Sequence, residues 1–531
     1  MSNQLKTRGR KPDRIYLPLF LFAIALIFHS VSARAEAELK HRIQGETAPP
    51  QPPLVPVDLR WGPQLFVDDF LIAEQEGLDK TTHSPTRYEG NPILGHEQGT
   101  TQPYVTVVRD PETQKFRMWY NRDIGKESCV AYAESEDGKN WTIPNLGIHG
   151  EANKLFPISS PFQNGYGVSV LDEGLEACDP NRRFKCVWWG QEKEWPEGDP
   201  GLRVAFSPDG LHWTKYEGNP VLPDFSELPY FDVDDIRKAY GIGDITDVYW
   251  DEFRNRYGVM LKTPAIPSDG YEGGPKARTY IRRLVSTSIS NDFVNWLRPW
   301  RVILPEENEG LLEFYGVGGP IARGSLLIGF VRMLHDDLPA DPGGEAEGIG
   351  YAVLATSRDG IRWERHDDIF LNRAEDSEAW DHAMTWIGCC LDVGDEMYIY
   401  YGGYKRGHKI EAKTERQLGL ATMPLDRFVS RDAEGKGSLR TVQCYLRDGK
   451  EKVLTLNADA SKGSIRVQLR DNRGEVIDGF SFEDCEPIAR DGLHIPVRWK
   501  SKSLDDLFAT TLHLEFGMEN ASLYGFDVTD R

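Results

Sequence analysis

Carboxylic acids recur just before apolar segments that repeat along this sequence, and they are the residues best suited to chemistry. Asp244 and Asp247 stand at one such segment, Glu313 at another and Asp381 at a third. Two neighbouring carboxyl groups, one protonated and one ionised, can cleave a glycosidic bond. The candidate catalytic residues are therefore Asp244, Glu313 and Asp381. Glu313 is the candidate general acid, because the aromatic residues at 314–315 would raise its pKa by desolvation. The sequence does not show which of Asp244 and Asp381 is the base or nucleophile and which is the stabiliser.

Other side chains in the same segments could bind a ligand. Tyrosine rings offer stacking faces, and Arg332 and His335 could hold a sugar hydroxyl or an acidic group. The candidate substrate-binding residues are Glu97, Tyr104, Tyr166, Asp247, Tyr315, Arg332, His335 and His382. The three acids also have structural interpretations: Asp244 as a turn cap, Glu313 as the partner of a nearby arginine, and Asp381 as a hydrogen-bonding residue between blades.

A seven-residue phrase, S-x-D-(G or F)-x-x-W, occurs four times and points to the elements that must position these side chains. The copies begin at Ser135, Ser207, Ser290 and Ser357, and their tryptophans follow one another at steps of 72, 83 and 67 residues. In this phrase Asp can accept backbone hydrogen bonds, Gly supplies a positive φ, and Trp can pack between neighbouring sheets. We therefore predict one propeller blade per copy.

A second pattern, two apolar strands joined by a turn, precedes each phrase and occurs once more after the last copy. The predicted strand pairs are 104–110 with 116–120, 167–171 with 184–189, 247–251 with 257–261, 319–322 with 326–330, and 384–388 with 397–401. We predict an all-β fold with a five-bladed β-propeller over residues 61–434. The lone strand 65–72 is expected to complete the last blade. The first strand of each blade would line a central channel, so that residues at its entry face a common funnel.

The pattern changes after residue 434. Segments 453–459, 464–470, 493–499 and 511–516 alternate at period two, with a tight turn at 472–474. They predict a β-sandwich over residues 435–531. Its sequence holds no dense functional cluster, so a stabilising appendage is the favoured interpretation and a sugar-binding module is the alternative.

The first 35 residues have the order of a secretory signal peptide: five basic residues before position 15, an apolar run over 15–28, and small residues up to Ala35. The fourteen-residue run is shorter than the about 20 residues that cross a membrane. We predict cleavage after Ala35, a Pro-rich linker over residues 36–60, and a secreted or periplasmic protein. An uncleaved membrane anchor is the alternative.

Charge narrows the range of partners. Without the predicted signal peptide, which holds six Lys and Arg residues and one Asp, the chain has 56 basic and 82 acidic residues and a net charge of −26. Such a surface repels nucleic acid and anionic membranes and is compatible with a neutral carbohydrate. No C-x-x-C or EF-hand spacing occurs, so no cofactor or catalytic metal is expected, although an acid-rich exported protein can bind a structural calcium ion. We expect a monomer.

The positions of the seven cysteines allow two disulfides. Cys178 with Cys186 could close a hairpin, and Cys444 with Cys485 could cross-link the last domain in an oxidising compartment. Buried free thiols are the favoured alternative for most of them.

Six phrases, at 65–69, 244–251, 394–403, 418–422, 456–459 and 479–485, resemble those of secreted bacterial proteins related to family 32 glycoside hydrolases. The resemblance covers residues 60–531 and implies a five-bladed propeller with a trailing sandwich. It also implies a carbohydrate substrate and three funnel acids, as in the related family 43 enzymes. The chain lacks the W-M-N-D-P-N-G and E-C phrases of the characterised enzymes, so their residue roles cannot be transferred one by one.

The leading functional hypothesis is a secreted glycoside hydrolase that acts on oligo- or polysaccharides through its funnel carboxylates. A non-catalytic propeller that binds glycans or proteins is the alternative. A sialidase-type site would need clustered arginines and a tyrosine nucleophile, for which Arg282, Arg283 and Arg332 are the candidate arginines. Phosphorolysis would need a basic anion site, and the sequence shows no obvious cluster for one.

Overall fold

The structure is a computed structural model, and it describes residues 55–95, 100–124, 127–150, 153–159, 165–192, 199–223, 242–265, 282–306, 309–408 and 416–531. The predicted signal peptide, and the predicted linker up to residue 54, lie outside these residues. Within the described ranges every regular element is a β-strand or a short 3₁₀ helix, which confirms the all-β fold class. These ranges contain no helix long and apolar enough to span a membrane.

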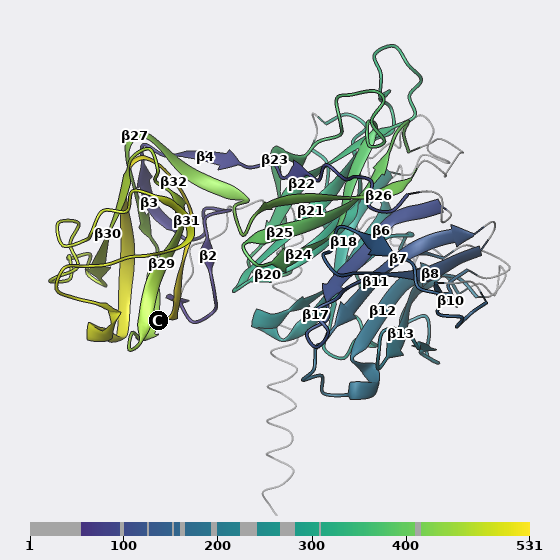
Figure 1. Ribbon diagram of the computed structural model, residues 1–531, viewed down its shortest axis with the longest axis horizontal. Coiled ribbons are helices and arrows are strands. Elements are labelled where there is room, and N and C mark those ends of the chain that lie inside the picture. Colours follow the sequence, from purple (N-terminus) through teal and green to yellow (C-terminus); the bar gives the residue numbers. More distant parts are fainter. Residues whose placement is uncertain are drawn as a thin grey trace, which may run out of the picture. The chain divides into compact units, whose positions relative to one another are not determined.

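Five innermost strands form a closed cycle (Figure 1). Each contacts the next along the chain, and the fifth contacts the first. The strands are β6 (Thr100–Arg109), β11 (Tyr166–Asp172), β16 (Thr246–Asp251), β20 (Glu313–Arg323) and β24 (Met384–Val393). Because a cycle of first strands is the defining arrangement of a propeller, the chain has a propeller fold. We call each of these strands, together with the strands that pair after it, a blade; the count of five propeller blades stays a prediction.

Each innermost strand begins an antiparallel series of strands. In the first blade these are β7 (Phe116–Ile124), β8 (Glu127–Ser135), β9 (Trp141–Thr142) and β10 (Lys154–Pro157). In the second blade they are β12 (Phe184–Gly190), β13 (Gly201–Ser207), β14 (Thr214–Lys215) and β15 (Leu222–Pro223). In the third blade they are β17 (Arg256–Ala265), β18 (Arg282–Ser290) and β19 (Trp300–Ile303). The fourth has β21 (Leu326–His335), β22 (Ile349–Ser357) and β23 (Glu364–Leu371), and the fifth has β25 (Glu396–Tyr404), β26 (Gln417–Pro424) and β5 (Thr86–Arg87). A parallel bridge between Gly350 and Met384 joins the last two blades into one sheet.

The repeated phrase forms the same turn after the third strand of the first four blades. In the second blade, Asp209 Oδ1 accepts hydrogen bonds from the backbone N–H groups of Leu211 and His212, both at 2.8 Å. Gly210 has a φ of 75° and donates its N–H to Ser207 Oγ at 2.8 Å. Although burial opposes the effect, these hydrogen bonds lower the pKa of Asp209 to about 2. The predicted turn is confirmed.

The turn also contacts the preceding blade. Trp119 of β7 donates its indole N–H to the Gly210 carbonyl at 2.8 Å. Tyr400 of β25 donates its hydroxyl to the Gly138 carbonyl at 2.9 Å. Three of the four motif tryptophans pack on aromatic rings of the preceding blade, with centroid distances of 6.1 Å for Trp141–Tyr400, 5.8 Å for Trp213–Phe156 and 6.2 Å for Trp363–Tyr249. In the third copy Phe293 makes this contact, with Phe206 at 6.0 Å. Each phrase is therefore both a turn and a contact between blades.

The strand that completes the last blade is not the one predicted. β5 pairs with β26, through Arg87 with Ala421 and Thr86 with Thr422. The segment 65–72 instead contributes to two cores: Leu65 and Val67 pack in the core of the fourth and fifth blades, and Phe66 and Leu71 pack in the core of the C-terminal domain. This alternation of burial resembles that of a blade strand, which is why the sequence pattern was misleading.

The C-terminal β domain recruits strands from the start of the chain. Its ten strands are joined by hydrogen bonds through the long strands β32 and β27, and Figure 1 shows the purple β3, which pairs with β27, in this domain. They are β1 (Val57–Asp58), β2 (Gln64–Leu65), β3 (Ile72–Glu76), β4 (Asp79–Thr82), β27 (Val429–Thr441), β28 (Cys444–Asp448), β29 (Lys452–Asp459), β30 (Ser464–Asp471), β31 (Asp491–Pro496) and β32 (Phe508–Asp530). The predicted boundaries at residues 61 and 435 therefore differ from the structure, because β1–β4 and most of β27 pair within this domain.

All seven cysteines are free thiols in the structure. Cys444 and Cys485 are both buried in the core of the C-terminal domain, and Cys178 is exposed. Neither of the two disulfides considered above is formed.

Candidate functional site

An aromatic cluster lies where the innermost strands begin and their hairpin partners end, and we call this side of the ring the mouth end. Tyr315 of β20 stacks on Trp386 of β24 with a centroid distance of 4.5 Å. Tyr104 of β6 and Tyr404 of β25 belong to the same buried cluster. Because these rings come from strands far apart in the sequence, the ring of blades alone brings them together.

Glu313 and Asp336 form a pair of buried carboxylates at the mouth end. The side chains of both are 0% exposed. Arg283 Nη1 lies 3.0 and 2.9 Å from the two oxygens of Glu313 and 3.3 Å from Asp336 Oδ2. The two carboxylates are therefore separated by no more than two hydrogen-bond lengths. Asp336 also contacts the imidazole of His408, with Nδ1 at 3.3 Å from Oδ1.

The electrostatics of this pair favour a protonated Glu313. Burial raises its pKa, the neighbouring charge of Asp336 raises it further, and Arg283 opposes both. Two neighbouring carboxylates repel each other in a medium of low dielectric constant, so Glu313 binds a proton more readily than it would in water. The arrangement can hold one neutral and one ionised carboxyl group side by side.

Asp244 is linked to Tyr315 through a lysine. It forms an ion pair with Lys262, whose Nζ lies 4.4 Å from the centre of the Tyr315 ring. Arg283 lies over the same ring at 5.3 Å. The side chain of Asp244 is 27% exposed, unlike that of Glu313. Through their cationic partners, Asp244 and Glu313 are therefore both linked to the ring of Tyr315.

Asp381 has different neighbours. Its Oδ2 accepts hydrogen bonds from Arg87 Nε at 2.8 Å and from the Tyr401 hydroxyl at 3.0 Å. Arg87 belongs to β5, so Asp381 binds the closing strand to the fifth blade. Within the described residues no hydrogen bond or ion pair joins Asp381 to Asp244 or Glu313.

Asp247 and Arg332 are bound to each other rather than open to a ligand. Two parallel hydrogen bonds of 2.8 Å join them, and Arg332 Nε also donates to the Ile387 carbonyl at 2.8 Å. Arg332 is 0% exposed and Asp247 is 6% exposed. Burial raises the pKa of Asp247, and Arg332 opposes the shift. This pair links β21 to β16 and β24 and fixes three blades at the mouth end.

The remaining candidates occupy varied places. Tyr104 is buried above the Arg332 guanidinium at 5.9 Å, and Tyr166 is half-buried against the aromatic cluster. His335 lies 3.3 Å from the Tyr351 hydroxyl. His382 is buried and contacts the Ala374 carbonyl and Asp341. Glu97 lies outside the described residues.

Sequence reasoning missed Asp336 and Asp123. Both stand at or just beyond the end of a second strand, where the hairpin returns to the mouth end. Asp123 accepts a hydrogen bond of 2.6 Å from Gln102, which in turn accepts one from Arg416. A search limited to residues before the first strands passed over these positions. The recurrence of an acid at the end of the second strand in two blades was the available signal.

No group of three or more His, Cys, Asp and Glu side chains within the described ranges is arranged to hold a metal ion.

Comparisons with known proteins give structural matches only. No protein-family model matches the chain, and no curated protein matches it. Similar solved structures include a glycoside hydrolase, which is 14% identical with a TM-score of 0.42 and matches 65% of this chain and 93% of its own. A family 43 arabinoxylan arabinofuranohydrolase from Bacillus subtilis is 10% identical, with a TM-score of 0.39 and coverage of 85% and 99%. An N-acetylgalactosamine deacetylase from F. plautii is 17% identical, with a TM-score of 0.39 and coverage of 66% and 96%. At these values the likeness carries no argument about activity.

Proposed function

We propose that this protein is a glycoside hydrolase whose reacting groups lie at the mouth end. The observation that supports it most directly is the pair of buried carboxylates, Glu313 and Asp336, that share the single nitrogen Nη1 of Arg283. Cleavage of a glycosidic bond needs one carboxyl group that stays protonated near neutral pH and another that is ionised. Burial and the neighbouring Asp336 raise the pKa of Glu313 against the effect of Arg283, which is the direction that a proton donor needs.

In this proposal Glu313 is the general acid. Its raised pKa keeps a proton available for the leaving oxygen of the sugar. Asp336 is a positioning residue that holds the pKa of Glu313 up and anchors Arg283. Asp244, the partly exposed acid that is paired with Lys262, would act as the base that activates water. Since Glu313 is wholly buried, the proposal requires the bound substrate to displace side chains that cover it.

The proposed substrate is a carbohydrate outside the cell. Tyr104, Tyr315 and Trp386 form a buried aromatic cluster at the mouth end, and the proposal requires the bound substrate to expose one of these rings to the apolar face of a sugar. Export follows from the predicted signal peptide and remains part of the proposal. Asp381 is assigned a structural role here, because its carboxylate holds the closing strand.

One observation favours the alternative of a non-catalytic binding propeller. Each candidate acid has a basic partner: Lys262 for Asp244, Arg283 for Glu313, and Arg87 for Asp381. Buried ion pairs of this kind also occur as purely structural contacts. The experiment below separates the two functions.

The test is turnover of plant and algal oligosaccharides by the full-length protein and by Glu313→Gln. The proposal expects release of reducing sugar by the wild type and a loss of about 10²–10⁴-fold in kcat for the variant, with oligosaccharide binding retained. Glu364→Gln is the matched control, because burial also raises the pKa of this carboxyl on the outer strand β23, and it should keep full activity. Binding without turnover by the wild type would establish the non-catalytic alternative. Equal turnover by wild type and Glu313→Gln would exclude Glu313 as the acid.

A further inference from the structure

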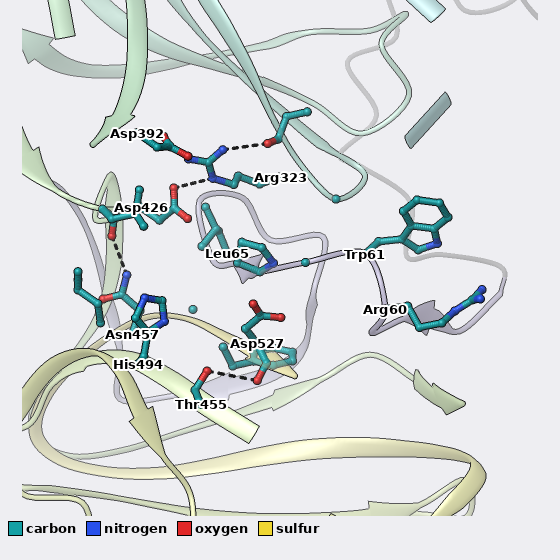
Figure 2. A pocket seen from close by; sticks show the side chains of 18 of the residues that line it. Arg60, Trp61, Leu65, Arg323, Asp392, Asp426, Thr455, Asn457, His494 and Asp527 are labelled. Carbon is teal, nitrogen blue, oxygen red and sulfur yellow. Dashed lines mark hydrogen bonds and ion pairs between the residues drawn. The ribbon is translucent and has the colours of Figure 1, made fainter. Parts of the chain in front are cut away.

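A cavity of about 580 Å³ lies at the opposite side of the ring from the mouth end, where the propeller meets the C-terminal β domain (Figure 2). Its propeller wall comes from the hairpin turns after β16 and β20, and its other wall from β29, β31 and β32. The N-terminal segment that contains Trp61 borders it as well. This volume is in the range of small-molecule binding sites, about 300–1,000 Å³.

Two aromatic rings are left exposed at the edge of this cavity. Trp61 is 42% exposed and Phe253 is 38% exposed, although most large apolar side chains of the described chain are buried. Their rings meet edge to face with a centroid distance of 5.2 Å. The Trp61 backbone is fixed closely: a Cβ on Gly324 would lie 2.4 Å from the Trp61 carbonyl oxygen. A rigid, exposed indole beside polar groups is a surface on which a sugar ring can stack.

Polar groups with free hydrogen-bonding capacity also face the cavity. Figure 2 shows the carboxylate of Asp527 pointing into the space between the Arg323–Asp426 pair and Trp61. One oxygen of Asp527 accepts the Val528 N–H at 2.7 Å, and within the described residues the other has no hydrogen-bond donor. The imidazole of His494 likewise has no hydrogen bond to a described residue. Burial raises the pKa of Asp527, while the nearby His494 lowers it.

The charge of the lining excludes an anionic ligand. Arg323 already binds two carboxylates, with Nε at 2.7 Å from Asp426 and Nη2 at 2.8 Å from both oxygens of Asp392. Arg60 is likewise paired with Asp58. Among the described residues that line the cavity, no arginine or lysine is therefore left to receive a negative group, and the acids present would repel one. A wholly apolar ligand is also disfavoured, because it would bury Asp527 without a partner.

We propose that this cavity is a second saccharide-binding site, separate from the mouth end, which holds a neutral oligosaccharide. One sugar unit would lay its apolar face on the indole of Trp61, and a neighbouring unit would donate hydroxyl hydrogens to Asp527 on the side of the cavity where His494 lies. This inference does not depend on the proposed hydrolase activity, because a propeller without catalysis could carry the same site.

The test is calorimetric titration of the full-length protein with neutral hexose and pentose oligosaccharides of two to four units. Trilysine is the cationic comparison. We expect at least one oligosaccharide to bind, and Trp61→Ala and Asp527→Asn each to weaken that binding by at least tenfold. His494→Ala should weaken it too, and because His494 is exposed and has no hydrogen bond to a described residue, this variant leaves the fold intact even if Trp61→Ala does not. Trp250→Ala is the matched control, since Trp250 is 37% exposed and does not line the cavity.

Turnover separates this inference from the proposed function, because Trp61→Ala and His494→Ala should weaken binding at the cavity and leave turnover unchanged, whereas Glu313→Gln should lose turnover and keep binding. Oligosaccharide binding that Glu313→Gln leaves unchanged and Trp61→Ala or His494→Ala removes would establish the second site. The inference is overturned if no oligosaccharide binds, if only trilysine binds, or if binding withstands Trp61→Ala, Asp527→Asn and His494→Ala. Loss of turnover in Glu313→Gln bears on the mouth end alone.

Discussion

At the scale of single residues, the chemistry of this protein depends on how buried carboxylates share a limited number of cations. A buried carboxylate needs a partner, because an isolated charge is costly in a medium of low dielectric constant. Asp247 has a partner of its own in Arg332, joined by two hydrogen bonds. Glu313 and Asp336 share Arg283. The shared cation is the reason that Glu313, rather than Asp247, is the better candidate for a proton donor.

A pH profile tests this arrangement. The general acid must be protonated, so turnover should fall as pH rises through the pKa of Glu313, on the alkaline side of the optimum. Asp336→Asn removes a negative charge that raises the pKa of Glu313, so the alkaline limb should move to lower pH. The measurement is kcat against pH, with Asp478→Asn in the C-terminal domain as the control. An alkaline limb that stays in place in Asp336→Asn, or moves to higher pH, would show that the two carboxylates are not coupled.

At the scale of elements, the repeated phrase joins local and tertiary structure in one turn. Its Asp and Ser stabilise the turn within a blade, and its glycine carbonyl accepts a hydrogen bond from the preceding blade. The glycine is required for two reasons at Gly210: a φ of 75°, and a neighbouring Trp119 ring only 2.7 Å from the position of a Cβ. The third copy places Phe293 at this position with a φ of 69°, where its ring packs on Phe206 of the preceding blade at 6.0 Å.

Two glycine substitutions separate these reasons. Gly147 has a φ of 64° and no atom within 4 Å of the place that a Cβ would occupy, so Gly147→Ala should cost only the left-handed backbone strain, about 1–2 kcal/mol. Gly210→Ala should cost a further 1–3 kcal/mol or so, because the added methyl group would displace Trp119. Urea unfolding of both variants measures the difference. Equal free energies of unfolding would mean that the contact between blades contributes little.

At the scale of the whole molecule, stability depends on segments that are distant in sequence closing the structure. β5 completes the fifth blade, and the strands just before it belong to the C-terminal domain. Removal of the residues after 434 would therefore leave β1–β3 without their partners. The Arg87–Asp381 ion pair holds the closing strand at its junction with the fifth blade.

Substitutions of this pair test its structural role. Arg87→Met should lower the free energy of unfolding by about 1–3 kcal/mol, less than for a fully buried pair, because the Arg87 side chain is 34% exposed and partly screened by water. The double variant with Asp381→Asn should cost less than the sum of the single changes. Urea unfolding measures all three variants. If Asp381→Asn abolished turnover at an unchanged free energy of unfolding, Asp381 would return to the catalytic set.

The sequence by itself determined the repeating units of this protein, because each blade carries its own local signals. The S-x-D-G phrase encodes a turn through contacts within seven residues, and the strand pairs alternate at period two. Glu313 was also identified from its register in the repeat.

Only the tertiary structure decided which acids lie together. Asp381 has the same register but binds Arg87, and Asp336, outside that register, lies beside Glu313. The partner of the segment 65–72 was likewise undetermined, because its alternating apolar residues fit either core. Side-chain partners across blades depend on ring closure, which brings together residues hundreds of positions apart and leaves no local trace in the sequence.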